Sequence, residues 1–225
     1  MPYNWKVVER KVDGRIFLGG LDGDCWAAPP PDPHSIFYYN QLENVVFKVV
    51  EIGGYSCGFD FDAEGNLWAG EYLLGWDDHM HILPCRLGMW RKEDVDAVIA
   101  GQSYLTWDEA SVVIELGTYP DPPNPEIDLN WGVSDVACDD RGNVYVSVNT
   151  YEQFDDNHEY GAVIKVHKDN EGIYQKEYLL LRDNTNNNNW DWFRSMTVDG
   201  NYLILDIDHN QMDPNSPDAC QVIQV

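Results

Sequence analysis

The sequence predicts an all-β fold, a four-bladed β-propeller in which residues 1–225 form a single domain, and three observations predict it. An apolar strand, an acidic-glycine turn and a second apolar strand follow one another in four places. Each of these hairpins is followed by short segments rich in β-branched and aromatic residues, which is the composition of strands. The chain also starts with a strand-like segment that has no obvious partner, and its last repeat is one strand short.

The four hairpins carry related turns, which contain Asp or Glu, Gly and, in most copies, Asn. Regular repetition of a unit of this size is typical of a fold built from similar parts. Four antiparallel strands to a unit is the blade of a propeller. The hairpins span Ile16–Ala28 with a turn at Leu21–Asp24, Gly58–Gly70, Asp135–Ser147 and Ser195–Asp206.

The repeats divide the chain into four blades, at about 14–53, 54–117, 133–182 and 193–225. We expect the outer strands of the first three blades at 35–39, 45–52, 86–91, 111–116, 162–167 and 176–181, and the last strand of the fourth blade at 221–225. One helix is expected at 93–100 in the second blade, because Val95, Val98 and Ile99 have helical spacing.

The ends of the chain suggest how the ring closes. Trp5–Arg10 reads as a strand that precedes the first hairpin, and the fourth blade lacks an outer strand. We therefore expect residues 5–10 to pair beside residues 221–225, which would remove an unprotected sheet edge. A longer parent protein with more blades is the alternative explanation.

Charge and composition exclude several classes of partner. The formal net charge of −25 argues against binding to nucleic acid or to an anionic membrane surface, since both need clustered Lys and Arg. The acidity also fits simple solubility or a saline habitat. We expect no signal peptide and no membrane insertion, because no apolar run has the required length. The five cysteines are scattered, which predicts buried thiols without a disulfide framework.

Two of the hairpins resemble a known type of propeller. Phe59–Gly70 and Val136–Val146 look like the first hairpin of NHL-repeat and gluconolactonase-like propellers. The resemblance implies a fold, in which Gly adopts a positive φ and Asp or Asn caps the turn. It implies little chemistry, because propellers of this type include lactonases, lyases, sugar binders and platforms for protein binding. The number of blades is similar to that of hemopexin-like domains.

Acidic and histidine residues gather in one set of connections. In a propeller, the connections between second and third strands emerge at the same end as those between successive blades. Five of the six histidines lie in or beside the former connections, each close to a carboxylate. This pattern predicts a divalent metal site for Zn, Fe, Mn or Ca, although such residues also form simple Asx turns. The candidate ligands are His34, Asp78, His79, His81, Asp156, His158, Asp208 and His209.

The connections between blades carry aromatic residues that suit the binding of sugars. Aromatic faces beside amide and carboxylate groups stack on a polar ring while also forming hydrogen bonds with it. The same side chains would equally serve to plug the wide end of a propeller. The candidates are Tyr119, Trp131, Trp190 and Trp192.

Catalysis has weaker support, because the familiar nucleophile and metalloprotease motifs are absent from the sequence. A metal-assisted hydrolase or lyase could use Glu71 and Asp206, at the ends of second strands, with Asn149 nearby. The resemblance to gluconolactonase-like enzymes implies a metal set of Glu, Asn and Asp, although these positions do not match the motif of that family residue by residue. Arg194 is a candidate for orienting an anionic substrate, or for simple pairing with Asp135 or Asp191.

Two functions of different class follow. The first is a non-catalytic binding or assembly module that engages a glycan, a partner protein or a metal ion, as in a virion or cell-surface accessory protein. The second is a small metal-dependent hydrolase of the lactonase type, or a lyase, with its site at the same end. A third, an acidic decoy for nucleic-acid-binding proteins, rests on charge alone. The sequence predicts neither the compartment nor the oligomeric state.

Overall fold

The structure is a computed structural model that describes residues 3–21, 34–53, 58–71, 85–117, 120, 132–149, 160–183, 192–208 and 219–225. Within this part of the chain the fold is all-β, with the helix α1 (Lys92–Ile99) and a 3-10 turn at Trp107–Glu109. The strands are β1 (Tyr3–Arg10), β2 (Arg15–Leu21), β3 (His34–Asn40), β4 (Val45–Glu51), β5 (Phe59–Phe61), β6 (Leu67–Gly70), β7 (Cys85–Trp90), β8 (Val112–Gly117), β9 (Gly132–Cys138), β10 (Val144–Asn149), β11 (Tyr160–Lys168), β12 (Tyr174–Asp183), β13 (Trp192–Asp199), β14 (Tyr202–Asp208) and β15 (Ala219–Gln224).

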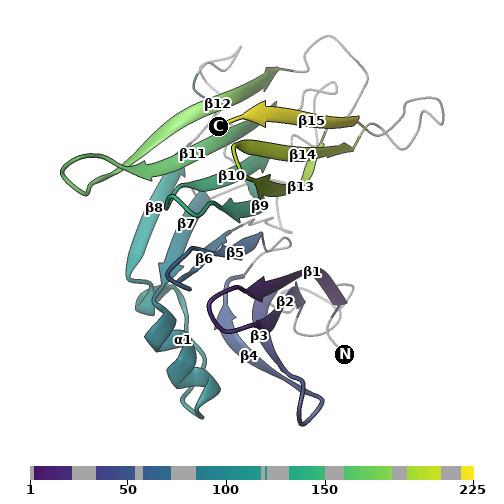
Figure 1. The fold of residues 1–225 in the computed structure, drawn as a ribbon, viewed down its shortest axis with the longest axis vertical. Coiled ribbons are helices and arrows are strands. Elements are labelled where there is room, and N and C mark those ends of the chain that lie inside the picture. The colour runs from purple at the N-terminus through teal and green to yellow at the C-terminus, as the bar shows by residue number, and fades with distance from the viewer. Residues whose placement is uncertain are drawn as a thin grey trace, which may run out of the picture.

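These strands form four antiparallel sheets, which are the blades of a four-bladed β-propeller (Figure 1). Blades 1, 2 and 3 contain β1–β4, β5–β8 and β9–β12, each paired in chain order, and blade 4 contains β13–β15. The first strands of successive blades contact one another: β1 touches β5, β5 touches β9, and β9 touches β13. The first strands therefore lie around the axis. The predicted fold class and number of blades are confirmed.

Blade 1 begins one strand earlier than the hairpin pattern predicted. The structure pairs β1 with β2 through a turn at residues 11–14, so that Arg15–Leu21 is the second strand and not the first. The backbone carbonyl of Arg10 accepts bonds from the amides of Asp13 (3.2 Å) and Gly14 (2.9 Å), and Gly14 has a φ of 71°. Asp13-Gly14 thus forms the turn that the sequence analysis assigned to Leu21–Asp24.

The N-terminal strand does not complete the last blade. β1 is bonded to β2 along its length, and β15 pairs with β14 alone among the strands that the structure describes. The predicted pairing of residues 5–10 with 221–225 is therefore wrong. A turn of four residues brings β1 beside β2, and so short a loop costs far less closure entropy than joining the two ends of the chain.

Two first hairpins are stabilised by the same turn, which opens with Asp and contains Gly-Asn. One carboxylate oxygen of Asp139 accepts the amides of Arg141 and Asn143, both at 2.9 Å, while the other accepts the Tyr145 hydroxyl at 3.0 Å. Asp62 bonds to its own turn in the same way, and its second oxygen accepts the indole N–H of Trp68 at 3.1 Å. The acidic residue of the repeat is therefore a structural cap.

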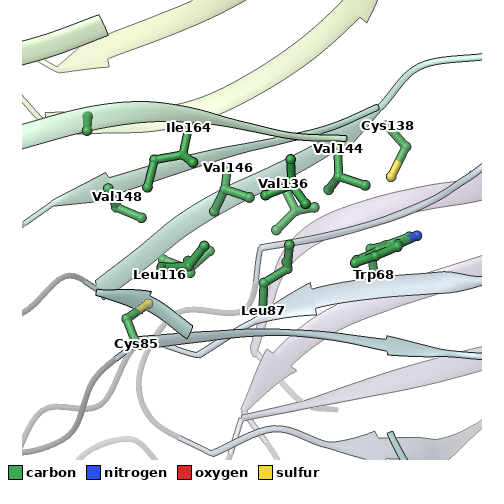
Figure 2. Packing of buried hydrophobic residues seen from close by; sticks show 13 residues of the cluster. Trp68, Cys85, Leu87, Leu116, Val136, Cys138, Val144, Val146, Val148 and Ile164 are labelled. Carbon is green, nitrogen blue, oxygen red and sulfur yellow. The ribbon is translucent and has the colours of Figure 1, made fainter. Parts of the chain in front are cut away.

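The core consists of layers between neighbouring blades. Figure 2 shows the layer between blades 2 and 3, where Trp68, Leu87 and Leu116 face Val136 and other apolar side chains of β9–β11. A second layer lies between blades 1 and 2, and a third between blades 3 and 4. Strand side chains alternate between faces, so each of the two middle blades contributes to two layers.

The helix predicted in blade 2 from its apolar spacing is confirmed, and it packs against the layer between blades 1 and 2. Val95 and Val98 are buried in this layer. Asp96 of α1 bonds to Arg10 of β1 at 2.5 Å, and Arg10 also pairs with Asp13. Arg10 is fully buried, with its guanidinium over the ring of Phe17. The two ion pairs therefore link the helix and the turn between β1 and β2 to the same guanidinium group, that of Arg10.

The cysteines follow the prediction in part. Cys85 and Cys138 are buried free thiols, and burial raises the pKa of both. Cys220 is a free thiol but is exposed on β15, which differs from the expectation. Cys25 and Cys57 lie outside the described residues. Of the helices that the structure describes, none is long and apolar enough to cross a membrane.

Candidate functional site

The predicted site belongs to one edge of the blades, which we call the loop edge. In every sheet the second strand ends and the third begins at this edge, because the strands alternate in direction. The connections that carry the predicted metal ligands start and finish here. The loop edge is defined by the strand ends Leu21, His34, Gly70, Cys85, Asn149, Tyr160, Asp208 and Ala219.

Most of the predicted ligands lie in the connections themselves. Three positions, Trp192, Arg194 and Asp208, fall within β13 and β14, and only their backbone is described. In the part of the chain that the structure describes, no group of three or more His, Cys, Asp or Glu residues could hold a metal ion. The residues outside this part are Asp78, His79, His81, Tyr119, Trp131, Asp156, His158, Trp190 and His209.

Glu71, a predicted catalytic residue, directly follows β6 and forms a closed ion pair. Its side chain is buried, and its two carboxylate oxygens accept Nε of Arg86 at 2.8 Å and Nη2 at 3.0 Å. The guanidinium carbon of Arg86 lies 4.3 Å from the ring centre of Trp107. The hydrogen bond to Glu71 raises the pKa of Arg86. This geometry indicates that Glu71 anchors the loop edge of blade 2.

Asn149, the second predicted catalytic residue, connects blades 3 and 4. Its side-chain amide donates to the hydroxyl of Ser134 and, at 3.2 Å, to the carbonyl of Phe193. Its side-chain oxygen accepts the amide of Phe193 at 3.3 Å. Asn149 is buried. Its side-chain amide therefore bonds to both backbone groups of Phe193 near the start of β13, as a neighbouring strand would.

The other two described candidates differ in exposure. Asp206 is exposed on β14, opposite Ser195 and Cys220 of the neighbouring strands. His34 is fully buried at the start of β3, and its backbone carbonyl accepts the amides of Ile52 (2.8 Å) and Gly53 (3.0 Å). The loop edge thus brings Glu71, Asn149 and His34 into the packed ends of their blades and leaves Asp206 open to solvent.

A second polar group, which sequence analysis did not identify as a site, lies at the propeller axis. The pairing of first and second strands skips one residue in three blades, at Trp5, Ser134 and Arg194. The residues that follow these bulges occupy equivalent places, each four positions before the residue that opens the turn, and Gly58 has this place in blade 2. We call the four residues Lys6, Gly58, Asp135 and Ser195 the axial cluster.

Asp135 is the centre of the axial cluster and joins three blades. One carboxylate oxygen accepts Nζ of Lys6 from blade 1 at 2.5 Å, and the other accepts the amide of Met196 from blade 4 at 2.7 Å. Nζ of Lys6 also donates to the carbonyl of Val136 at 2.7 Å. A Cβ atom on Gly58 would lie 2.4 Å from the Cα atom of Asp135, so blade 2 also packs directly against this point.

A second buried carboxylate lies beside the cluster. Asp60 of β5 accepts the amide of Cys138 at 2.8 Å and thereby ties blade 2 to blade 3. Burial raises the pKa of both Asp60 and Asp135, and the charge of Lys6 opposes this rise. Asp135 forms its described ion pair with Lys6, and the side chain of Arg194, which the sequence suggested as a partner, lies outside the described part of the structure. An acidic residue in the middle of an apolar strand, as in Phe-Asp-Phe at 59–61, is the sequence signal for this group.

Comparisons with known proteins leave the family open. No family model matches the chain, and no curated protein matches it. The likeness to NHL-repeat and gluconolactonase-like propellers thus rests on the two hairpins that open with Asp62 and Asp139, and what the structure shows of it is the propeller arrangement of the blades.

Proposed function

We propose that the protein is a binding or assembly module whose loop edge engages a glycan, a partner protein or a metal ion. The observation that carries the proposal is the contrast at this edge between buried, hydrogen-bonded side chains at the strand ends and variable connections. Glu71 is buried and pairs with Arg86 inside blade 2, and Asn149 is buried and joins blade 3 to blade 4. The connections that start and finish at the loop edge vary in length and carry aromatic, amide and carboxylate residues. A rigid edge that supports variable loops is a common design for binding.

The aromatic residues around β13 favour a glycan as the ligand. Trp190 and Trp192 flank the start of this strand, next to a run of Asn residues at 186–189. Aromatic stacking combined with amide hydrogen bonds suits sugar rings. Asn149 fixes the same strand start through Phe193. The backbone of Phe193, the residue that follows Trp192 in the sequence, is therefore held in place by the buried side chain of Asn149.

A glycan array followed by titration calorimetry tests the glycan form of the proposal. We expect Trp190→Ala and Trp192→Ala to weaken binding of the array hit at least tenfold without a change in the melting temperature. Tyr104→Ala is the matched control, since Tyr104 is 46% exposed on a segment that leads to β8. An array without a hit, or equal loss in the control, would count against a glycan.

Elemental analysis tests the metal form separately. Stoichiometric Zn, Fe, Mn or Ca in purified protein, lost when His79, His158 and His209 are replaced together by Ala, supports a metal site in the connections. Protein that is free of metal and fails to bind added metal excludes it. Because the glycan and metal variants share no residue, failure of one form is distinguishable from failure of the other.

The alternative function is a metal-dependent hydrolase of the lactonase type, or a lyase, as the gluconolactonase-like hairpins suggest. The exposure of Asp206 is the observation that favours it, because this carboxylate remains open at the same edge. Turnover of a lactone panel that is lost in Asp206→Asn, with metal content measured in parallel, is the test. A virion or cell-surface setting is part of the binding proposal only, and copurification with such structures would support it.

A further inference from the structure

The outer edge of blade 4, strand β15, presents backbone groups that pair with no other strand that the structure describes. The amide of Val225 donates to the carbonyl of Asn201 at 2.8 Å, which places Val225 in the bonded ladder with β14. Bonded positions alternate along an antiparallel strand, so Ile223 also faces β14, while Cys220, Val222 and Gln224 direct their N–H and C=O groups away from it. Among the described residues, no strand pairs with these outward groups.

The other three blades protect their outer edges, as soluble sheet proteins normally do. In blade 1 the backbone of Leu105 bonds to both Glu51 and Val49 of β4. In blade 2 the ammonium of Lys176 donates to the carbonyl of Glu115 on β8 at 2.8 Å. In blade 3 the outer strand itself carries the exposed charges of Lys176 and Glu177. Each edge therefore has a cover or a charge that discourages pairing with another strand.

Within the described part of the chain, β15 has neither form of protection. Its residues Ala219–Gln224 include no charged side chain, in a chain with a net charge of −25. Val222, whose backbone points outward, is 57% exposed and lies opposite Ile204 on the same face of the sheet. The composition is that of a strand paired on both sides, although the structure describes a partner on one side only.

We propose that β15 pairs with β15 of a second copy of this chain, so that the two fourth blades form one continuous antiparallel sheet across a two-fold axis at Val222. In this register Val222 faces its own copy and Cys220 faces Gln224, so all the outward backbone groups are satisfied. An isologous contact of this kind uses the same patch on both copies. Two copies of this uncharged edge can pair without repulsion between side chains, whereas like charges directly opposite each other destabilise paired strands. This inference concerns a different edge from the proposed function and stands independently of it.

Sedimentation equilibrium of the full chain tests the proposal. We expect a dimer whose dissociation constant falls as salt is raised from 50 mM to 500 mM, because salt screens the repulsion between two strongly acidic copies. Val222→Lys should raise that dissociation constant at least tenfold, since two ammonium groups would then face each other. Ile173→Lys is the matched control, because Ile173 is 55% exposed on the turn between β11 and β12.

Val222→Pro provides a second test that acts on the backbone. Proline removes an N–H that points away from β14, so the blade itself should fold, as circular dichroism will check. Dimerisation should nevertheless be lost. A chain that stays monomeric at 100 µM in high salt would overturn the proposal, as would a dimer that withstands Val222→Lys. Capture of a different, basic peptide at this edge by a monomeric chain would overturn it as well.

Cross-linking tests the register. In a Cys220→Ser background, Val222→Cys should give a disulfide-linked dimer on mild oxidation, because directly opposed residues in a bonded antiparallel pair lie about 5.5 Å apart between Cα atoms, within the range of a disulfide. Ile173→Cys in the same background should remain uncross-linked. Equal cross-linking of the two variants would show random collision and contradict the predicted pairing.

Discussion

Blades 3 and 4 share a hairpin pattern but differ in how much of each is buried. Blade 3 packs on both faces: Val136 and Val146 lie in the layer toward blade 2, and Ala137 and Tyr145 in the layer toward blade 4. Blade 4 buries one face, while Tyr202 on its other face is 51% exposed. The difference teaches that the same hairpin can serve as a structural hub or as a platform, depending on the number of neighbours it has.

The turns of the two blades show the same division. Asp139 of blade 3 is 4% exposed and accepts bonds from Arg141, Asn143 and Tyr145. Asp199, which opens the turn of blade 4, is exposed, and no hydrogen bond of its side chain joins another described residue. Of these two blades, blade 3 therefore has the turn with more side-chain hydrogen bonds between described residues. Substitutions at equivalent places in the two blades test this comparison directly.

The largest effect is expected at Asp135, the hub residue of the axial cluster. Asp135→Ala leaves Nζ of Lys6 without its carboxylate and the amide of Met196 without an acceptor. Breaking a buried ion pair by removal of one partner costs about 4 kcal/mol. We expect urea denaturation to show a loss of this size in the free energy of unfolding.

The double variant Lys6→Met with Asp135→Leu separates the cost of an unpaired charge from the value of the pair. Replacement of both partners by apolar groups removes the buried charge altogether, so the double variant should recover about half of the lost stability. If it were no more stable than Asp135→Ala, the lost free energy would lie in the bond to Met196, which both variants lack.

Gly58→Ala should have the next largest effect, a loss of about 3 kcal/mol in the free energy of unfolding, because overpacking of a tight core contact carries a penalty of this order. The added Cβ would meet the backbone of Asp135 at 2.4 Å, and backbone cannot move aside as a side chain can. Ser195→Ala, at the equivalent place in blade 4, is exposed and should change the free energy by less than about 0.5 kcal/mol. Similar effects at the two sites, measured by thermal unfolding, would break the comparison.

These sites also show what the sequence could predict. The turns at Asp62 and Asp139 were predicted correctly, because Asp, Gly and Asn occupy fixed places in a local hydrogen-bond pattern. The first hairpin was misplaced because Asp13-Gly14 and Asp22-Gly23 satisfy the same local rule. Only pairing between strands decides between them, and that is a property of the whole sheet.

The candidate site was less accessible to sequence reasoning than the fold. Glu71 and Asn149 were chosen as polar residues at strand ends, yet their partners Arg86 and Phe193 come from other strands. The axial cluster was missed because its residue types differ from blade to blade. What its members share is distance from the turn, and the misplaced first hairpin hid this relation for Lys6.

Asp139→Ala should cost about 2 kcal/mol, since it leaves several turn donors without their acceptor. Asp199→Ala should cost less than about 0.5 kcal/mol, as is usual for an exposed residue. Chemical denaturation of both variants, with hydrogen exchange of the amides of Arg141 and Asn143 as the local readout, measures the contrast. Equal costs would mean that the turn of blade 4 is as well bonded as that of blade 3.

The smallest effect is a pH dependence carried by Asp60, which joins blade 2 to the hub. Burial raises the pKa of Asp60, against the opposing charge of Lys6 and the amides of Cys138 and Phe61. A carboxylate with a raised pKa in the folded state binds more protons there than in the unfolded chain, so its contribution to stability is full below about pH 4 and falls as the pH rises through the folded-state pKa. The Asp60→Asn variant lacks this titration.

The difference in unfolding free energy between the wild-type chain and Asp60→Asn should therefore be most in favour of the wild type at low pH and decline toward neutral pH. Urea titrations at half-unit steps from pH 3.5 to 7 measure it. A difference that instead grew with pH would mean that Lys6 and the backbone amides outweigh burial. Ion pairing and hydrogen bonding would then be the main stabilising interactions at the axis. Packing on both faces of blade 3 would contribute less than the comparison of blades 3 and 4 implies.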